Sequence, residues 1–583
     1  MSAPAANNAS WARLLVAELV RCGVDYAVVA PGSRSTPLVM ALADSDAIEC
    51  TVCHDERGAA FHALGYARAT RRPATVVCTS GTAVANMLPA VVEAATDAQP
   101  MLVVTADRPW ELQDSGANQT IEQRDIFGGY AVWGTQLPPP DPRVAPRALL
   151  SAIDQAVHRC LTPVSGPVHV NVAFREPLDP GDAAEPVAAG IERWDRELSA
   201  GGSPLTTYLA NGGAALPDLN GVVGALRAAT TGLVVAGRGA TEGQRSAAPA
   251  IGALAAALGW PLLGDATSGV TGTPGLQLLL STTAGRRLGR ADTVLLFGAA
   301  PTTKGFLQMV SDDPPQTYLQ VASSSRRLDP THLVSHRVVA SPAMVAERLL
   351  PLLGTVGDVA GSTVSDAAAA AHRAARDALP HDRLSEPLVA QTVAAMAQRP
   401  LGLFVGSSMP IRDLDSFAAP LAADLSVAAN RGASGIDGSI ATALGFATGL
   451  GAPVVALIGD TAAIHDASSL AQLQGAAHGL VLVVVNNRGG GIFSMLPIAA
   501  QADAATFERY FGAPHEVSFA DLAAAFGLAH RHPDDHHALV AALADAYQRA
   551  TTGGSTLVEV TTDRAANAAL HAAVANAVAQ AVG

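Results

Sequence analysis

The chain has 583 residues, of which 49% are hydrophobic and 15% charged, so it is neither a disordered nor a fibrous protein. At about 150 residues per domain, the length predicts roughly two to four domains. Acidic residues outnumber basic ones by 51 to 37, and the net charge of −14 argues against a general nucleic-acid-binding or anionic-membrane surface.

Short runs rich in valine and leucine recur along the chain, and each is followed by a turn and an alanine-rich helical stretch. Buried runs of this length that alternate with helices predict parallel sheets built from βαβ units. The predicted strands are, in chain order, Tyr26–Ala30, Ala74–Cys78, Met101–Thr105, Val168–Val172, Leu233–Ala236, Thr293–Phe297, Leu403–Val405, Val454–Ile458 and Leu480–Val485.

Two polar segments, roughly 176–204 and 354–385, separate three stretches of similar size. We therefore expect an α/β protein with three consecutive parallel-sheet domains, at 1–185, 200–355 and 380–583. The longest uncharged stretch, Ser246–Gly264, contains Pro249 and Pro261 and predicts a helix that runs into a strand rather than a membrane span.

No secretory signal is visible at the N-terminus, and the five cysteines form no disulfide framework for a chain of this length, so we expect a cytoplasmic protein. Cys50 and Cys53 form a lone CxxC, for which we expect no redox or zinc role. The histidine-rich stretch 530–537 predicts a solvated loop with acidic residues at a helix start rather than a metal cluster. Residues 237–243 (GRGATEG) have the spacing of a turn and not of a dinucleotide fingerprint.

The segment 454–497 carries the strongest signal for chemistry. It reads as a strand (VVALIGD), a helix at about 466–477, a strand (GLVLVVVNN) and a glycine-rich loop (RGGGIF). The crossover brings Asp460 and Asn487, 27 positions apart, to the same carboxyl edge of a sheet. Two hard oxygen ligands and a loop carbonyl suit Mg²⁺. Because Mg²⁺ completes its coordination shell with waters and phosphate oxygens, a diphosphate ligand is implied.

This pattern resembles the signature of thiamine-diphosphate (ThDP) enzymes, whose pyrimidine-binding, central and diphosphate-binding domains match the three-domain layout. The resemblance implies that Asp460, Asn487 and the Gly489 carbonyl hold Mg²⁺ or Mn²⁺. It also requires a glutamate in the N-terminal third that hydrogen-bonds N1′ of the aminopyrimidine. Glu56, in the strand-to-helix stretch IECTVCHDERGAA at 48–60, fits that catalytic role.

Further motifs resemble the family of 2-succinyl-5-enolpyruvyl-6-hydroxy-3-cyclohexene-1-carboxylate (SEPHCHC) synthases, the ThDP enzymes of menaquinone biosynthesis. They are PGSRSTP at 31–37, DRPWELQDSGANQ at 107–119, GSSMPIR at 406–412, NRGASGIDG at 430–438 and GIFSMLP at 491–497. The resemblance implies decarboxylation of 2-oxoglutarate and 1,4-addition of the resulting carbanion to isochorismate. It also implies a homodimer or homotetramer whose subunits share active sites.

Both substrates are dicarboxylates, and the motifs are rich in arginine, whose planar fork grips carboxylates. By resemblance, 2-oxoglutarate is held by Ser408, Arg412 and Arg431, and isochorismate or its adduct by Ser33, Arg34, Arg108 and Gln119. Ile436 would prop the cofactor into its bent form, and Ile492 and Phe493 would line the pocket. Lys304, the only lysine of the chain, follows a central-domain strand and would reach a substrate carboxylate.

Two positions depart from the family pattern. Thr461 replaces the third glycine of the signature, and Arg488 follows Asn487 where a small polar residue is more usual. Neither replaces an expected metal ligand, but both bear on the diphosphate contacts. The alternatives are another ThDP-dependent 2-oxoacid carboligase similar to acetolactate synthase, and a catalytically silent scaffold of the same fold.

Overall fold

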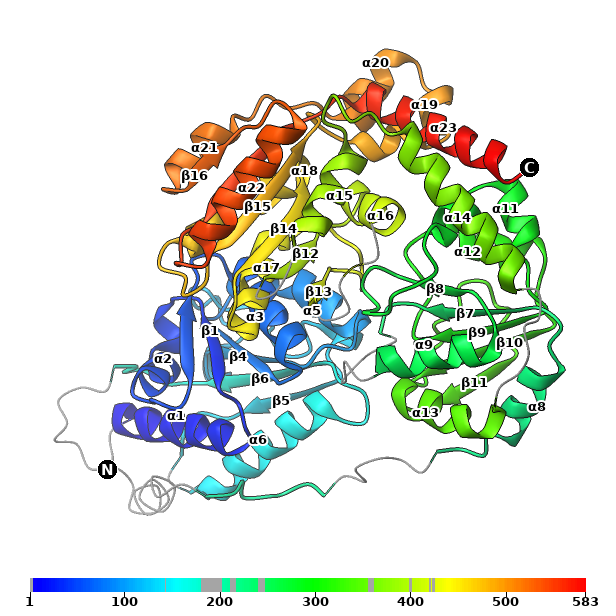
Figure 1. Ribbon diagram of the computed structural model, residues 1–583. Helices are drawn as coiled ribbons and strands as arrows, with labels where there is room; N and C mark the ends of the chain where they lie inside the picture. Colours follow the sequence, from blue (N-terminus) through cyan, green and yellow to red (C-terminus); the bar gives the residue numbers. More distant parts are fainter. Residues whose placement is uncertain are drawn as a thin grey trace. The chain divides into compact units, whose positions relative to one another are not determined.

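The computed structural model describes residues 4–141, 143–179, 202–209, 216–239, 247–354, 361–397, 401–418, 421 and 425–583. Figure 1 shows the helices and strands along the chain, and the contacts among these residues divide it into two units. The first comprises 1–210, 430–452 and 465–480, and the second comprises 211–429, 453–464 and 481–583.

The first unit contains a parallel six-stranded sheet with the strand order β2-β1-β3-β4-β6-β5. The central strand β4 is buried along its whole length, as expected for a strand covered on both faces. The strands are β1 (Tyr26–Val29), β2 (Glu49–Val52), β3 (Ala74–Cys78), β4 (Met101–Asp107), β5 (Trp133–Leu137) and β6 (Pro167–Ala173). The helices are α1 (Pro4–Arg21), α2 (Thr36–Ala43), α3 (Glu56–Thr70), α4 (Thr82–Asn86), α5 (Leu88–Thr96) and α6 (Pro146–Leu161).

Two later segments, α17 (Ser439–Leu450) and the 3₁₀ helix η4 (Ala467–Leu473), belong to the same unit. Helix α17 packs closely on α3, because glycines stand where the two backbones meet. A Cβ on Gly65 would lie 2.1 Å from the Thr442 carbonyl oxygen, and one on Gly445 would lie 1.8 Å from the His62 carbonyl oxygen. Any larger residue at either position would push the two helices apart.

The second unit contains two sheets. The first is parallel, has the order β11-β10-β9-β7-β8, and is formed by β7 (Gly232–Ala236), β8 (Leu262–Gly264), β9 (Thr293–Phe297), β10 (Thr317–Ala322) and β11 (His336–Val339). Its helices are α8 (Asn220–Ala228), α9 (Ala247–Leu258), α10 (Leu276–Ser281), α11 (Thr283–Leu288), α12 (Lys304–Asp312) and α13 (Pro342–Leu353). The next helix along the chain is α14 (Gly361–Ala378).

The other sheet has the order β13-β12-β14-β15-β17-β16. Its strands are β12 (Gly402–Val405), β13 (Val427–Ala428), β14 (Val454–Gly459), β15 (Leu480–Asn486), β16 (Ala529–Arg531) and β17 (Thr556–Thr561). Its helices are α15 (Glu386–Met396), α16 (Met409–Phe417), α18 (Asp460–His465), α19 (Ile498–Gln501), α20 (Ala504–Phe507), α21 (Phe519–Ala525), α22 (His536–Ala550) and α23 (Arg564–Ala581).

The α/β prediction with three parallel-sheet domains is confirmed, and the predicted strands match observed ones to within two residues at either end. The stretch 246–264 holds α9 and β8, as predicted, and the described helices include none that is long and apolar enough to cross a membrane. The exact domain bounds stay a prediction. Both polar segments that separate the predicted domains, and the GRGATEG turn, lie partly outside the described residues.

The helix predicted at about 466–477 is wrong. Helix α18 begins at Asp460 and ends at His465, and a 3₁₀ helix follows. The physical reason is the role of Asp466, whose carboxylate caps another helix. Its Oδ2 atom accepts the backbone N–H groups of Ile440 and Ala441 in the first turn of α17, at 2.7 and 3.0 Å.

Candidate active site

The carboxyl ends of three neighbouring strands carry the residues expected to bind metal and substrate. Ser408 follows β12, Asp460 follows β14 and Asn487 follows β15, and these strands lie side by side in the sheet. Loops at this edge of a parallel sheet are where ligands bind.

Asp460 is joined directly to the glycine-rich loop. The residue is 2% exposed, and its Oδ2 atom accepts the backbone N–H of Gly489 at 2.9 Å. Its Oδ1 atom accepts the backbone N–H of Thr461 at 2.6 Å and the Thr461 hydroxyl at 3.2 Å. The first departure from the family pattern therefore contacts an expected metal ligand directly.

Asn487 presents an oxygen that nothing in the described structure satisfies. Its Oδ1 atom is buried and has no hydrogen-bond partner among the described residues. A buried acceptor without a donor is unfavourable by about 1–3 kcal/mol, and a cation at this position would relieve that cost. Carboxylate and amide oxygens are also the donors that Mg²⁺ prefers, so the residues at this edge fit a divalent cation.

Gly489 occupies a position that no other residue can take without rearrangement. Its φ is +137°, and a Cβ there would lie 2.1 Å from the carbonyl oxygen of Gly512. The loop continues into the 3₁₀ helix η5 (Gly491–Met495), in which Ile492 and Phe493 are half-buried. The ring of Phe493 packs edge-on against Phe511, with centroids 5.7 Å apart.

Ser408 and Arg412, both expected to bind 2-oxoglutarate, lie together at the start of α16. Ser408 precedes α16 with a φ of +74°, a strained value for a residue with a side chain and one that often marks functional sites. The half-buried Arg412 donates from Nη1 to the Ser408 carbonyl oxygen at 2.5 Å. Arg431 belongs to the other unit, so its pairing with Arg412 on one substrate stays a prediction.

In the first unit, Glu56 is the first residue of α3. The helix is capped by the preceding residue, because the Asp55 carboxylate accepts the N–H groups of Arg57 and Gly58 at 2.9 and 3.5 Å. The half-buried Glu56 carboxylate makes no hydrogen bond to another residue that the structure describes. Burial, with the Glu56 charge as a second cause, raises the pKa of the Cys78 thiol at the end of β3.

The predicted isochorismate residues gather near the end of β3. Arg108 donates from Nη1 to the Ser80 hydroxyl and, at 2.6 Å, to the Gln119 carbonyl oxygen, while Gln119 Nε2 donates to the Ser80 carbonyl at 2.9 Å. Arg34 is buried and donates its own backbone N–H to Thr79 Oγ1 at 3.2 Å. Burial, and secondarily the charge of Arg34, lowers the pKa of Arg108. Ser33, beside Arg34, is exposed.

The loop that carries Arg431 and Ile436 is fixed by a carboxylate from α5. The backbone N–H groups of Gly432 and Ala433 donate to Oε1 and Oε2 of Glu93, at 2.8 and 2.6 Å. Arg68 in turn donates to Glu93 Oε1 at 2.7 Å. The loop ends at Gly438, whose φ is +61° and whose Cβ would lie 1.9 Å from the Phe61 ring.

Lys304 is the first residue of α12 and is exposed. It follows β9 on the carboxyl side of its sheet, as predicted from the sequence. Whether it contacts substrate stays a prediction.

Four residues of the site region were not predicted: Ser80, Glu93, Glu386 and His515. His515 Nε2 lies 3.2 Å from Asp460 Oδ2, and Glu386 accepts a hydrogen bond from Asn487. Ser80 could have been found, because it lies just after a predicted strand. Glu93 lies within a helix and carries no such signal.

The other motifs form no metal site among the described residues. All five cysteines are free, and the 530–537 stretch forms the end of β16 and the start of α22, which Asp535 caps by accepting the Ala538 N–H. The helix start predicted within 530–537 is confirmed, whereas the absence of a redox or metal role at either motif stays a prediction.

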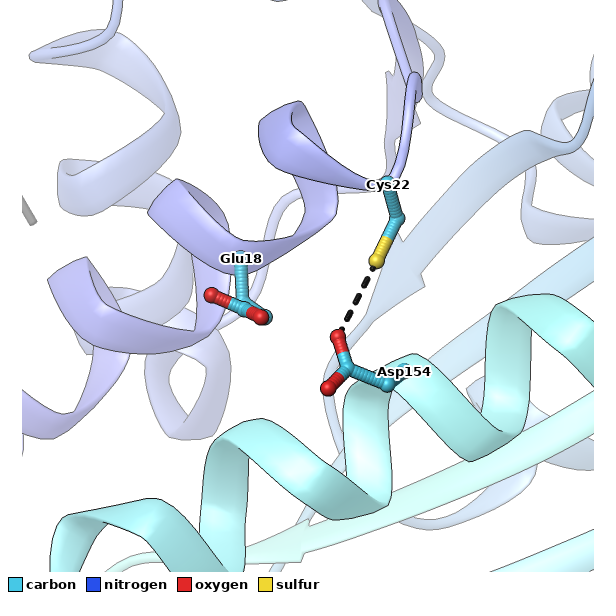
Figure 2. Close-up of side chains that lie close together, drawn as sticks. All are labelled: Glu18, Cys22 and Asp154. Atoms are coloured by element: carbon cyan, nitrogen blue, oxygen red, sulfur yellow. Dashed lines mark hydrogen bonds between the residues drawn. The ribbon is translucent and has the colours of Figure 1, made fainter. Parts of the chain in front are cut away.

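A second cluster of possible metal ligands, Glu18, Cys22 and Asp154, is shown in Figure 2. All four of its carboxylate oxygens already have donors: Glu18 accepts from Leu205 N and Arg21 Nη1, and Asp154 accepts from Thr206 N and Cys22 Sγ. The cluster therefore anchors the segment 202–209 to α1 and α6.

Comparison with known proteins bears on the whole chain. Residues 10–126 match the "thiamine pyrophosphate enzyme, N-terminal TPP binding domain", 225–405 the "middle domain of thiamine pyrophosphate" and 420–560 the "thiamine pyrophosphate enzyme, C-terminal TPP binding domain". The chain is 48% identical to the SEPHCHC synthase of Rubrobacter xylanophilus, over 97% of each chain. It is 42% identical to the SEPHCHC synthase of Salinibacter ruber, over 96% of this chain and 95% of the relative, and 40% identical to that of Chlorobium phaeobacteroides, over 96% of each.

Proposed function

The chain belongs to the family of SEPHCHC synthases, and on this basis we propose which residues bind the cofactor, which transfer protons and which bind the two substrates. The enzyme is a ThDP-dependent transferase of menaquinone biosynthesis. It decarboxylates 2-oxoglutarate and adds the resulting four-carbon unit to isochorismate.

The cofactor anchor consists of Asp460, Asn487 and the Gly489 carbonyl, which would hold Mg²⁺ or Mn²⁺ against the diphosphate. The observation that carries this assignment is the buried, unpartnered Oδ1 atom of Asn487 on the loop that Asp460 binds. When bound, ThDP supplies an electron sink that stabilises the carbanion left by decarboxylation.

Glu56 would hold and exchange a proton at N1′ of the aminopyrimidine. Its carboxylate is available for this because Asp55, and not Glu56, caps helix α3. Ile436 would support the bent cofactor, and Ile492 and Phe493 would keep water from protonating the carbanion.

The arginines supply the charge that two dicarboxylates require. We assign Ser408, Arg412 and Arg431 to 2-oxoglutarate, and Ser33, Arg34, Arg108 and Gln119 to isochorismate. Burial, and then the charge of Arg34, lowers the pKa of Arg108 although Arg34 is paired with Glu176 at 2.8 Å, and an anionic substrate group near Arg108 would offset this effect. Lys304 would add a further positive charge toward a substrate carboxylate.

The decisive assay supplies 2-oxoglutarate and isochorismate with ThDP and Mg²⁺, and measures CO₂ release and the adduct. Consumption of pyruvate in place of 2-oxoglutarate would favour the carboligase similar to acetolactate synthase. No turnover of either 2-oxoacid, with ThDP bound, would favour the silent scaffold.

We further propose an assembly of at least two chains, in which Glu56 of one chain and Asp460 of another serve the same site. This rests on the family resemblance, and the cytoplasmic location likewise stays a prediction. Mixing inactive Glu56→Gln chains with inactive Asp460→Ala chains tests the shared site. Hybrid dimers regain one intact site if the two residues come from different chains, and they stay inactive if each site lies within one chain.

A further inference from the structure

Glu386 is a buried carboxylate that the assignments above leave without a role. It is the first residue of α15 and is 4% exposed. The helix begins there because Ser385 accepts the Leu388 N–H and Pro387 occupies the first turn. Glu386 and Asn487 line the same cavity at the carboxyl edge of the sheet, together with Thr562 and Asn567.

One oxygen of Glu386 receives two donors. Oε1 accepts the Asn487 Nδ2 hydrogen bond at 2.8 Å, across 101 positions of sequence, and the Thr562 hydroxyl at 3.3 Å. An oxygen used as an acceptor can face only the NH₂ group of a carboxamide. The contact therefore fixes which end of the Asn487 amide faces α15.

The other end of the amide is the oxygen expected to bind metal. With Nδ2 held by Glu386, Oδ1 is directed elsewhere, and it is the buried atom that has no partner among the described residues. Two positions further along the chain, the Gly489 N–H binds Asp460. If the amide were turned over, it would present hydrogen atoms rather than a lone pair to a cation.

We propose that Glu386 is a positioning residue that orients the Asn487 carboxamide, so that Oδ1 is available to the divalent cation. This inference rests on the proposed metal site. Substitution of a residue that hydrogen-bonds a metal-binding side chain typically lowers the affinity for the metal by about 10–100-fold.

Two conservative variants distinguish the effect of the side-chain length of Glu386 from the effect of its negative charge. Glu386→Gln keeps the chain length and an acceptor oxygen but loses the charge, whereas Glu386→Asp keeps the charge but is one methylene too short to contact Asn487. The measurement is Mn²⁺ affinity of the ThDP-loaded full-length protein, from the free Mn²⁺ signal in electron paramagnetic resonance. We expect Glu386→Asp to weaken Mn²⁺ binding about 10-fold or more and Glu386→Gln to stay within about 3-fold of the unaltered protein.

The proposal would be overturned if Glu386→Gln weakened Mn²⁺ binding and Glu386→Asp did not, because the charge of residue 386 would then matter more than its contact with Asn487. Equal Mn²⁺ affinity in the two variants would overturn it as well. Thr562→Val removes only the second donor to Oε1 and serves as the matched control, with Mn²⁺ affinity expected within about 2-fold. The thermal midpoint of each metal-free variant shows whether folding has changed. If the unaltered protein itself binds no Mn²⁺ with ThDP, the proposed metal site fails, which is distinct from failure of the orienting role.

Discussion

Glu93 and Gly432 are 339 positions apart in the sequence, and a 2.8 Å hydrogen bond joins the Gly432 N–H to the Glu93 carboxylate. The second carboxylate oxygen accepts the Ala433 N–H, and Arg68 donates to the same oxygen that accepts the Gly432 N–H. The Glu93 side chain is almost fully buried, so these bonds are shielded from water. The loop that carries Arg431 and Ile436 is thereby held in place by helix α5.

Glu93→Gln should destabilise the protein by about 2–4 kcal/mol, because the amide can accept from only one of the two backbone N–H groups and leaves Arg68 partly unpaired. Urea unfolding of the purified variant measures this. Glu111→Gln is the matched control, since Glu111 pairs with Arg175 at a partly exposed site, where loss of the pair should cost less than about 1 kcal/mol. Equal losses in the two variants would contradict the role of Glu93.

Gly489→Ala should abolish tight binding of metal and ThDP, because the added Cβ would collide with the Gly512 carbonyl and move the loop. The control is Gly475→Ala, at a residue with a φ of +82° and open space around it. That variant has the backbone strain of about 1 kcal/mol without a collision, so its cofactor affinity should be unchanged. Isothermal titration with ThDP and Mg²⁺ compares the two, and wild-type affinity in Gly489→Ala would refute the close contact.

Acid should weaken the first unit through His62. Burial lowers the pKa of His62 from 6.5 to about 4, and its Nδ1 donates to Gln472 Oε1 at 2.8 Å. Between these two values the unfolded chain binds more protons than the folded one, so stability is lost as pH falls from 6.5 toward 4, by at most about 3 kcal/mol.

His62→Gln removes the titrating group, so denaturant unfolding between pH 7 and pH 4.5 should show a shallower loss in this variant. An unchanged slope would show that His62 does not titrate across this range.

Glu56→Gln should abolish turnover and leave binding of Mg²⁺ and diphosphate nearly intact, because Glu56 belongs to a different unit from the metal ligands. A steady-state assay and a ThDP titration of the same preparation separate the two effects. Full activity in the variant would exclude the proton role of Glu56, and lost ThDP binding would make it a binding residue instead.

The strands could be predicted closely because buried parallel strands have a simple sequence pattern. Each is a short apolar run between polar turns, and β3 and β9 match their predictions at both ends. Because the carboxyl ends of neighbouring parallel strands meet at one edge of a sheet, Asp460 and Asn487 could be placed at the same edge without any side-chain geometry.

Hydrogen bonds from acidic side chains to distant segments of the chain cannot be recognised in the sequence in the same way. The acids Glu93, Glu386 and Asp466 all resemble ordinary helix residues in the sequence. Each bonds to a segment at least 25 positions away, so only the folded chain shows their roles. The misplaced helix at 466–477 has a related origin, since Asp466 Oδ2 binds the first turn of α17 while its Oδ1 accepts the Ser469 hydroxyl at 2.7 Å.

Lys304 has a practical consequence. It is exposed at the start of α12 and carries the only ε-amino group among the 583 residues. Apart from the α-amino group of the chain, an amine-directed reagent therefore has one group to modify, where most proteins offer many. A fluorophore coupled there would report on the carboxyl side of the β9 sheet from a known position, with no engineered cysteine.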